Sequence, residues 1–237
     1  MIELSARLMA AAELMGECET AADIGTDHGY LPVWLVQSGK AKRVIACDIN
    51  SGPLTRAKHT VEKTGLSDKI SPRLGPGLTK LAPGEAETIA VCGMGGSLII
   101  SILEESEITA RTAGTLVLQP QNDIPKVRYF LHRSGYHITD EKMVLDGGKF
   151  YTVLSARFGT AAEKYETEAE YLFGSVLLKR RDPVLREYIL RAAAKQERIL
   201  WELSRQSTEK SKTRLAELTK QHELYKEVLK CLQPAKI

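Results

Sequence analysis

The sequence contains no hydrophobic run that approaches the length of a membrane-spanning helix, so we expect a protein that does not cross a membrane. Its first eight residues form an amphipathic helical pattern with an early acid, Glu3, which is unlike a secretory signal peptide. Cysteine is scarce, and no Cys-x-x-Cys spacing occurs among Cys18, Cys47, Cys92 and Cys231. We therefore expect buried thiols in a reducing cytoplasm, with no disulfide framework and no metal site.

Charge is distributed unevenly along the 237 residues, although 43% hydrophobic and 27% charged residues make an ordinary globular composition. Residues 160–237 carry 16 Lys and Arg against 12 Asp and Glu, whereas residues 1–159 carry 17 against 18. The basic C-terminal part is a mild indication of a polyanionic partner. Charged helical surfaces are usually just solvated, so the charge alone identifies no partner.

Residues 21–30 read Ala-Ala-Asp-Ile-Gly-Thr-Asp-His-Gly-Tyr and predict a short buried strand, a tight turn and a helix that begins at the tyrosine. Gly25 and Gly29 bracket the turn, where glycine lets a ligand approach the backbone closely. A second buried strand over residues 43–48 ends at Asp48. An acid at this strand end can accept hydrogen bonds from the ribose hydroxyls of an adenosine. The two strands together therefore predict a nucleoside cofactor.

The turn departs from the Gly-x-Gly-x-x-Gly fingerprint of dinucleotide-binding proteins, because Asp27 stands where the middle glycine is expected. An anionic side chain there would repel a pyrophosphate, whereas it suits a cofactor that carries positive charge, such as S-adenosylmethionine (SAM). The alternative is an ordinary strand and turn in which an aspartate caps the following helix. The second strand with its terminal acid favours the SAM site.

Glycine-rich turns also follow two later strands, at Gly75-Pro76-Gly77 and at Gly93-Met94-Gly95-Gly96. In a doubly wound sheet, ligands bind beyond the carboxyl ends of the strands, so both turns are expected to face the same crevice as Gly25. In many SAM enzymes an acid occupies the first of these turns. Because proline stands there in this sequence, adenine recognition would rest on backbone groups.

Enzymes that methylate an exocyclic amine usually have Asn or Asp followed by Pro-Pro and an aromatic residue at the second of these turns, and this motif accepts a hydrogen bond from the amine. The motif is absent from this sequence, which argues against amino-group methylation. The residues predicted to bind the cofactor are Asp23, Gly25, Thr26, Asp27, His28, Gly29, Asp48, Ile49, Gly75, Pro76, Gly77, Cys92, Gly93, Met94 and Gly95.

The fold class predicted from this pattern is α/β, a Rossmann-like SAM methyltransferase sheet of seven strands in a domain over residues 1–159. An N-terminal helix packs on it, and the sheet ends in a hairpin of 136–144 and 149–158 around Asp146-Gly147-Gly148. The other strands are expected at 69–74, 87–92 and 115–118, and the other helices at 51–63, 97–107 and 126–134.

The C-terminal part, residues 160–237, predicts an α-helical domain. One helix is expected over 165–181, and Asp182-Pro183 is an N-cap and first-turn proline that restart a helix. Two apolar series with heptad spacing follow, and their phase breaks near Gln206-Ser207-Thr208. We therefore expect an antiparallel coiled-coil hairpin. The heptad positions are Leu185, Ile189, Ala192, Gln196, Ile199 and Leu203, then Leu215, Leu218, His222, Tyr225, Leu229 and Leu232.

Polar residues follow the fifth strand, in the run Gln119-Pro120-Gln121-Asn122-Asp123. Amides and an acid at a strand end are costly to bury unless they form hydrogen bonds. In one interpretation Asn122 or Asp123 caps the helix that follows. In the other, Gln119 and its neighbours line the pocket for the target, and the residues alone leave both interpretations open.

Residues 22–32 (Ala-Asp-Ile-Gly-Thr-Asp-His-Gly-Tyr-Leu-Pro), with Cys92-Gly93-Met94-Gly95-Gly96 and Gln119-Pro120-Gln121, closely resemble the bacterial TrmK family. Its members are tRNA (adenine-N1) methyltransferases that act on adenine 22, and the resemblance covers nearly the whole chain. Pro76 departs from the Gly-Asp-Gly that is usual in the family. The resemblance implies a SAM cofactor, a tRNA partner and methyl transfer to a ring nitrogen of adenine.

A neutral ring nitrogen already carries an in-plane lone pair, so this reaction needs positioning and stabilisation of developing positive charge more than a strong base. Asp27 is the first candidate for that stabilisation. The basic hairpin would hold the tRNA backbone, and the target base would be flipped out or already exposed. The candidates for positioning are Arg7, His28, Tyr30, Gln119 and Asn122.

Two other functions stay open at this point. One is a SAM enzyme that acts on a small metabolite and uses the hairpin for dimerisation. The other is a non-catalytic nucleotide-binding protein that uses the coiled coil as an adaptor. The sequence does not fix the oligomeric state, although a monomer is favoured.

Overall fold

A computed structural model describes residues 1–159, 164–205 and 208–233. The chain divides into two compact units, residues 1–164 and residues 165–237, and each is described here by itself. The boundary expected between residues 159 and 160 falls beside 160–163, which lie outside the described residues.

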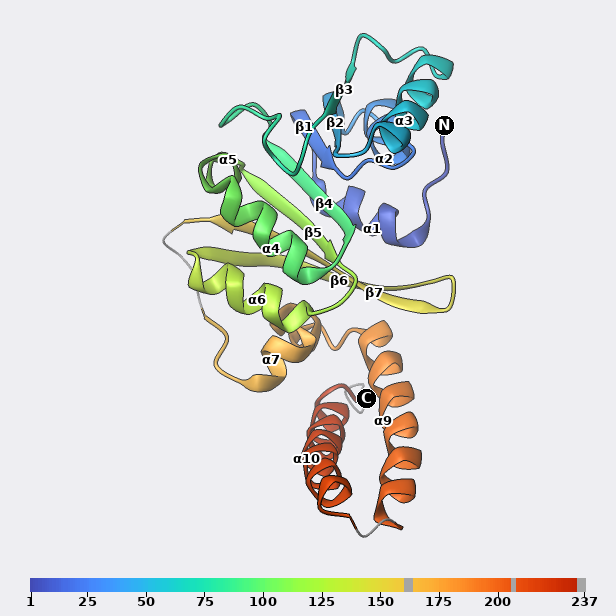
Figure 1. Ribbon diagram of the computed structural model, residues 1–237, viewed down its shortest axis with the longest axis vertical. Helices are drawn as coiled ribbons and strands as arrows, with labels where there is room; N and C mark the ends of the chain where they lie inside the picture. Colours follow the sequence, from blue (N-terminus) through green and yellow to red (C-terminus); the bar gives the residue numbers. More distant parts are fainter. Residues whose placement is uncertain (160–163, 206–207, 234–237) are drawn as a thin grey trace. The chain divides into compact units, whose positions relative to one another are not determined.

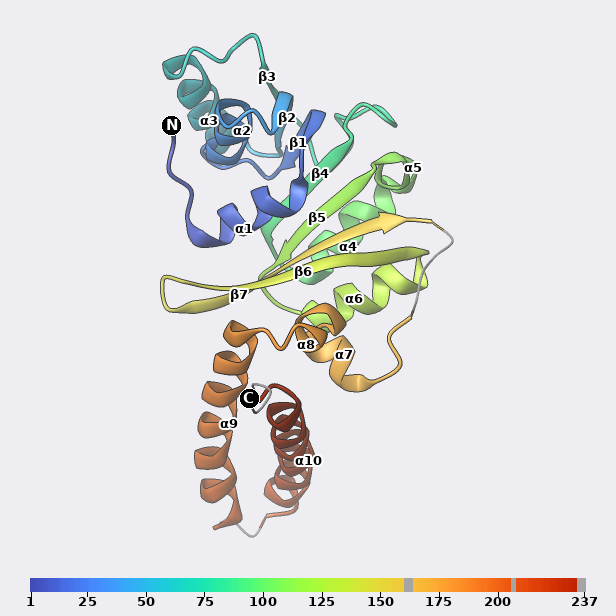
Figure 2. The same ribbon diagram turned by 180° about the vertical axis from the view of Figure 1, so that it is seen from behind.

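A sheet of seven strands runs through the first unit, in the order β3-β2-β1-β4-β5-β7-β6 (Figures 1 and 2). Neighbouring strands from β3 to β5 pair in parallel, and β7 pairs antiparallel with both β5 and β6. This confirms the seven-stranded Rossmann-like sheet with its terminal hairpin. The strands are β1 (Cys18–Ile24), β2 (Ala41–Asp48), β3 (Ile70–Leu74), β4 (Thr88–Met94), β5 (Thr115–Pro120), β6 (Tyr136–Asp146) and β7 (Lys149–Phe158).

Helices cover both faces of the sheet and enclose two hydrophobic cores (Figures 1 and 2). One core lies under α1 (Ala6–Met15), α2 (Tyr30–Gln37) and α3 (Ser51–Lys63). The other lies under α4 (Gly96–Glu105), α5 (Glu107–Thr112) and α6 (Ile124–Arg133). The alternating faces of β1 supply both, because Ala21 packs into the first core and Ala22 into the second.

Strand order places the crevice between β1 and β4. The chain leaves β1 for β2 on one side, while β4 pairs with the other side of β1. The helices that follow these two strands diverge to opposite faces, so a crevice opens beyond the carboxyl ends of β1 and β4. The two glycine turns predicted to bind the cofactor follow these two strand ends.

Helices α2 and α3 begin where the sequence predicts, and the hairpin turn lies at the predicted glycines. Gly147 and Gly148 both have positive φ, 54° and 80°, as the tightest hairpin turns require. The helix expected at 97–107 is present as α4, which ends at Glu105, and a separate helix that was not expected, α5, follows Ser106. At Ser106 the backbone leaves helical geometry, with φ −126° and ψ 43°.

The second unit contains α7 (Glu168–Phe173), α8 (Ser175–Lys179), α9 (Pro183–Ser204) and α10 (Glu209–Cys231) among its described residues. The single helix expected over 165–181 is wrong, because Gly174 has φ 93° and separates α7 from α8. The predicted restart is confirmed, since the Asp182 side chain accepts a hydrogen bond from Leu185 N at 2.8 Å.

Helices α9 and α10 run side by side in opposite directions (Figures 1 and 2). The expected phase break involves Gln206 and Ser207, which lie outside the described residues. The buried positions depart from the expected heptads, because Ala193 and Val228 are buried and Ile199 is 37% exposed. Straight helices have 3.6 residues per turn and drift away from a strict seven-residue repeat.

Over the described ranges, no helix combines the length and apolarity of a bilayer-spanning segment.

Candidate functional site

A cavity of about 610 Å³ opens at the carboxyl ends of β1 and β4. Its walls come from the β1–α2 turn, the end of β4, the chain after β5 and the first residues of the protein through α1. The lining residues are Glu3, Leu4, Ser5, Arg7, Leu8, Asp23, Gly25, Thr26, Asp27, His28, Gly29, Tyr30, Leu31, Cys92, Gly93 and Gln121. The cavity thus brings together most of the residues predicted around the β1–α2 turn.

Backbone hydrogen bonds join the turns that follow β1, β2 and β3. The amides of Gly25 and Thr26 donate to the Cys47 carbonyl oxygen at 2.8 and 2.9 Å. The Gly75 amide donates to the Asp48 carbonyl oxygen at 2.9 Å. The three predicted cofactor turns are therefore held next to each other at one edge of the sheet.

Gly25 has a backbone conformation that favours glycine and lies against the flexible end of a side chain from β4. Its φ is +82°, a region that other residues rarely adopt. A Cβ at this position would lie 2.3 Å from the Met94 Cε atom, which comes from the end of β4. The turn and the β4 end are therefore in close contact.

Asp23 places a buried carboxyl group at the wall of the cavity, where it is 6% exposed near the carboxyl end of β1. Burial raises the pKa of Asp23 to about 6, an effect that the Thr26 hydroxyl and the Arg7 guanidinium partly offset. The Asp48 carboxylate raises this pKa further. The protein offsets the negative charge of this carboxylate only in part, so a cationic group of a ligand beside it would be stabilised.

Gln119 is fully buried and positions its neighbours. Its Oε1 accepts from Gly93 N at 3.1 Å and from Arg7 Nη1 at 3.4 Å, while its Nε2 donates to the Pro120 carbonyl at 3.2 Å. This amide therefore holds the β4 turn and the Arg7 side chain in place. The cavity wall itself contains Gln121, the next residue with a side-chain amide.

Asn122 has a comparable role at the start of α4, where its Oδ1 accepts from Gly96 N at 3.0 Å. Asp123 occupies the N-cap position of α6 without a side-chain hydrogen bond to the helix. Asp123 is therefore the N-cap of α6 by position, without a capping hydrogen bond from its side chain, and Asn122 serves a different helix. A contact of Gln119 or Asn122 with the target stays a prediction.

Arg7 is fixed from several sides. Its backbone amide donates to Asp146 Oδ2 at 3.1 Å, which links the hairpin turn to the first turn of α1. Its guanidinium lies 5.9 Å from the centre of the Tyr151 ring. The side chain therefore reaches the cavity from the N-terminal helix with its position set by β5, β6 and β7.

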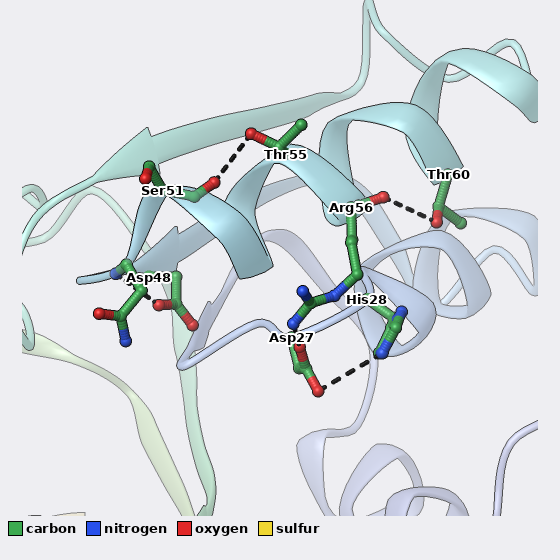
Figure 3. A network of polar contacts seen from close by, with 8 residues as sticks. Asp27, His28, Asp48, Ser51, Thr55, Arg56 and Thr60 are labelled. Carbon is green, nitrogen blue, oxygen red and sulfur yellow. Dashed lines mark hydrogen bonds and ion pairs between the residues drawn. The ribbon is translucent and has the colours of Figure 1, made fainter.

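Asp27 lies at the rim of the cavity, 62% exposed, and pairs with Arg56 of α3 (Figure 3). Its other oxygen lies 3.5 Å from His28 Nε2. The Arg56 guanidinium lowers the pKa of this carboxyl, and His28 adds to the effect. The His28 and Tyr30 rings stack with their centres 5.3 Å apart and an angle of 15° between their planes.

The remaining predicted cofactor residues lie at the adjacent strand ends, and they do not line the cavity. Asp48 is 8% exposed, and its Oδ1 accepts from Asn50 N at 2.7 Å. Ile49 is 63% exposed, next to Asp48. Pro76 and Gly77 continue the turn after β3, where Gly77 has φ +48°. Their assignment to the cofactor stays a prediction.

Gln121 is one of the neighbours of Gln119 that were expected to line the pocket, whereas Glu3 and Ser5 in the cavity and Arg56 at its rim were not predicted. The helical pattern over the first eight residues is wrong at its start, because α1 begins at Ala6 and the residues before it reach the crevice. Within the described ranges there is no group of three or more His, Cys, Asp or Glu side chains that could hold a metal ion.

Comparison with known proteins gives one family. The sequence profile described as TrmK, tRNA (adenine(22)-N(1))-methyltransferase, matches residues 21–227. The tRNA (adenine(22)-N(1))-methyltransferase of Bacillus subtilis (strain 168) is 37% identical over 232 residues, which cover 96% of this chain and 98% of that protein.

Solved structures with the same fold include two with a cofactor molecule. The putative tRNA (m1A22) methyltransferase Sp1610 of Streptococcus pneumoniae in complex with S-adenosyl-L-methionine has a TM-score of 0.85 and 32% identity, covering 96% of this chain and 100% of that one. TrmK of M. capricolum in complex with S-adenosyl-homocysteine has a TM-score of 0.83 and 26% identity, covering 97% and 99%.

Proposed function

The chain belongs to the family of tRNA (adenine(22)-N(1))-methyltransferases, and from this membership we propose that it transfers a methyl group from SAM to N1 of adenine 22 in tRNA. The observation that supports this most strongly is the cavity at the ends of β1 and β4, with a buried carboxyl at its wall. The protein would act in the cytoplasm, where tRNA is modified.

The residues of the cavity fit SAM. Its volume of about 610 Å³ lies within the range of small-molecule sites. Asp23 offers a carboxylate to the ammonium group, and the amides of the Gly25–Gly29 turn lie beside it. Asp48 and the turn at Gly75 would take the ribose and adenine at the neighbouring strand ends. When bound, SAM supplies an electrophilic methyl group on a sulfonium.

The protein contributes position and charge to the reaction. Gln119 holds both the β4 turn and Arg7, so the two walls of the cavity keep a fixed separation. Asp27 faces the same cavity from its rim and would stabilise the positive charge that develops on the adenine ring. No residue has to remove a proton from the ring nitrogen before it reacts.

The tRNA is far larger than this cavity, so most of its contacts lie outside it. The second unit supplies basic residues on α9 and α10, including Lys195 and Arg198, which are exposed. Phosphate contacts of this kind position a nucleic acid without reading its sequence. We assign the second unit the role of holding the tRNA backbone.

The affinity for SAM should depend on pH through Asp23. In the free protein this carboxyl is ionised above a pKa of about 6 and protonated below it. A ligand ammonium binds the ionised form, so the affinity should be constant above that pKa and fall roughly tenfold per pH unit below it. Calorimetric titration with SAM from about pH 5 to about pH 8 measures this.

The matched variant is Asp23→Asn, which keeps the shape and removes the titration. It should bind SAM more weakly, with an affinity that is flat over the same range. An unaltered protein whose affinity does not change through the pKa of Asp23 would show that this carboxylate does not contact the ammonium.

Methyl incorporation tests the proposed function itself. An unmodified tRNA transcript incubated with the protein and methyl-labelled SAM should become labelled, and a transcript with guanine in place of adenine 22 should not. SAM binding without label in tRNA would instead favour a small-metabolite methyltransferase. Absence of SAM binding would favour the non-catalytic adaptor.

A further inference from the structure

A second groove of about 680 Å³ lies beside the cavity, between the start of α2 and the outer face of α3. It is lined by Ile2, His28, Tyr30, Thr55, Arg56, His59, Thr60, Lys63 and Thr64. Arg56, His59 and Lys63 follow one another at spacings of three and four residues, so they share one face of α3. All three are exposed.

The lining of the groove is positively charged. None of its lining residues, all within the described range 1–159, carries a carboxylate. The hydroxyls of Thr55 and Thr60 donate to backbone carbonyls of α3 (Figure 3). The Thr64 hydroxyl does the same, so all three donors are already used within the helix. Donors for a ligand come from the guanidinium, the ammonium and the imidazole rings. A guanidinium and an ammonium in a lining without carboxylates suit phosphate oxygens.

The groove borders the cavity, because His28 and Tyr30 line both. These two rings stack on each other at the border. A polynucleotide that placed one base in the cavity would carry its next phosphates across this border. The distance between successive phosphates is small compared with the length of α3, which spans 13 residues.

We propose that this groove binds phosphates of the tRNA strand next to the target nucleotide, and that Arg56 exchanges its contact with Asp27 for a phosphate contact when the tRNA binds. This inference rests on the proposed function, since it names the position of part of the same substrate.

The Arg56–Asp27 pair is suited to such an exchange. The side chains are 49% and 62% exposed, and exposed ion pairs of this kind are weak. A phosphate offers the guanidinium two oxygens in a geometry that it matches well. Once Arg56 has turned to a phosphate, the Asp27 charge is no longer offset and acts on the base in the cavity. Arrival of the substrate would thereby activate Asp27.

The first test compares two charge reversals on the same helix. Lys63→Glu removes a cation of the groove, whereas Lys58→Glu makes the same change at an exposed α3 residue that does not line it. We expect Lys63→Glu to raise the KM for a tRNA transcript about tenfold, to leave kcat within about twofold and to lower the salt dependence of binding by about one phosphate contact. Lys58→Glu should change KM by less than about twofold.

The second test concerns the exchange. Asp27→Asn removes the competitor for Arg56, so it should bind the tRNA transcript about threefold more tightly at low salt. Arg56→Gln should weaken tRNA binding while leaving the affinity for SAM unchanged. A merely structural role for the pair would instead weaken tRNA binding in both variants and lower their melting temperatures together.

Equal effects of Lys63→Glu and Lys58→Glu on tRNA affinity would show that the groove does not bind tRNA phosphates. Weaker tRNA binding by Asp27→Asn would overturn the exchange. Affinity is measured by fluorescence anisotropy of a labelled transcript, which needs no turnover. If the unaltered protein binds the transcript but methylates no nucleotide in it, the proposed function fails, and the two variants still decide whether the groove binds RNA.

Discussion

Replacing Asp27 by asparagine should lower kcat for tRNA methylation by about a hundredfold while SAM affinity stays within about twofold. In the proposed reaction the carboxylate would stabilise charge that is present on the base only as the methyl group is transferred, so its loss should affect turnover and not binding of the cofactor. Asparagine keeps the size of the side chain, while it loses the negative charge and with it the ion pair to Arg56. Single-turnover kinetics with a saturating tRNA transcript measure the effect.

The matched control is Glu62→Gln, which neutralises an exposed acid of α3 that lines neither the cavity nor the groove. It should leave kcat unchanged. If Asp27→Asn turned over at the normal rate, Asp27 would serve only to hold Arg56 and the β1–α2 turn, and the charge on the base would need another source of stabilisation.

Removing the second unit should separate cofactor binding from tRNA binding. Both hydrophobic cores of the first unit consist of residues between Leu4 and Ala156, so a chain of residues 1–164 should fold. It contains the whole cavity and should bind SAM within about twofold of the full chain. It should lose about a hundredfold in tRNA affinity, because the basic residues of α9 and α10 are gone.

Circular dichroism and SAM calorimetry establish that the shortened chain is folded, and anisotropy titration then gives its tRNA affinity. In the full chain, Lys195→Glu with Arg198→Glu should weaken tRNA binding and lower its salt slope by about two contacts. The same reversals at Lys58 and Lys69, exposed residues of the first unit, are the matched control. A shortened chain that bound and methylated tRNA normally would reopen the role of the second unit in dimerisation.

Most of the sheet could be predicted because its signals are local. Asp48 ends a buried strand, Ser51 begins a helix after it, and Gly147 with Gly148 closes a hairpin, each set by the residues at that point. The separate helix α5 and the break at Gly174 were missed, since helical periodicity does not mark a change of helix axis.

The site was predicted less completely because part of it is assembled from distant residues. The β1–α2 turn is contiguous and was found, whereas Glu3 and Ser5 reach the cavity only because α1 packs beside β4, β5 and the hairpin. The pairing of Arg56 with Asp27 joins positions 29 residues apart. A sequence signal did exist for the groove, in the basic residues spaced along one face of the helix at 51–63.

Gln119 illustrates a different limit. Its place at a strand end indicated a functional residue, and it is fully buried there. Its partners, Gly93 and Arg7, come from β4 and α1, and they make it a residue that positions the walls of the cavity. Residue type and strand position cannot distinguish a side chain that touches a ligand from one that holds its neighbours.

Mapping the modified nucleotide is the decisive test of methyl transfer to N1 of one adenine in tRNA. An unmodified transcript is incubated with the full chain and SAM, digested to nucleosides and fragments, and analysed by mass spectrometry. We expect 1-methyladenosine at position 22 and at no other position. A methyl group on another atom, at another position, or absent from tRNA despite SAM binding would contradict it.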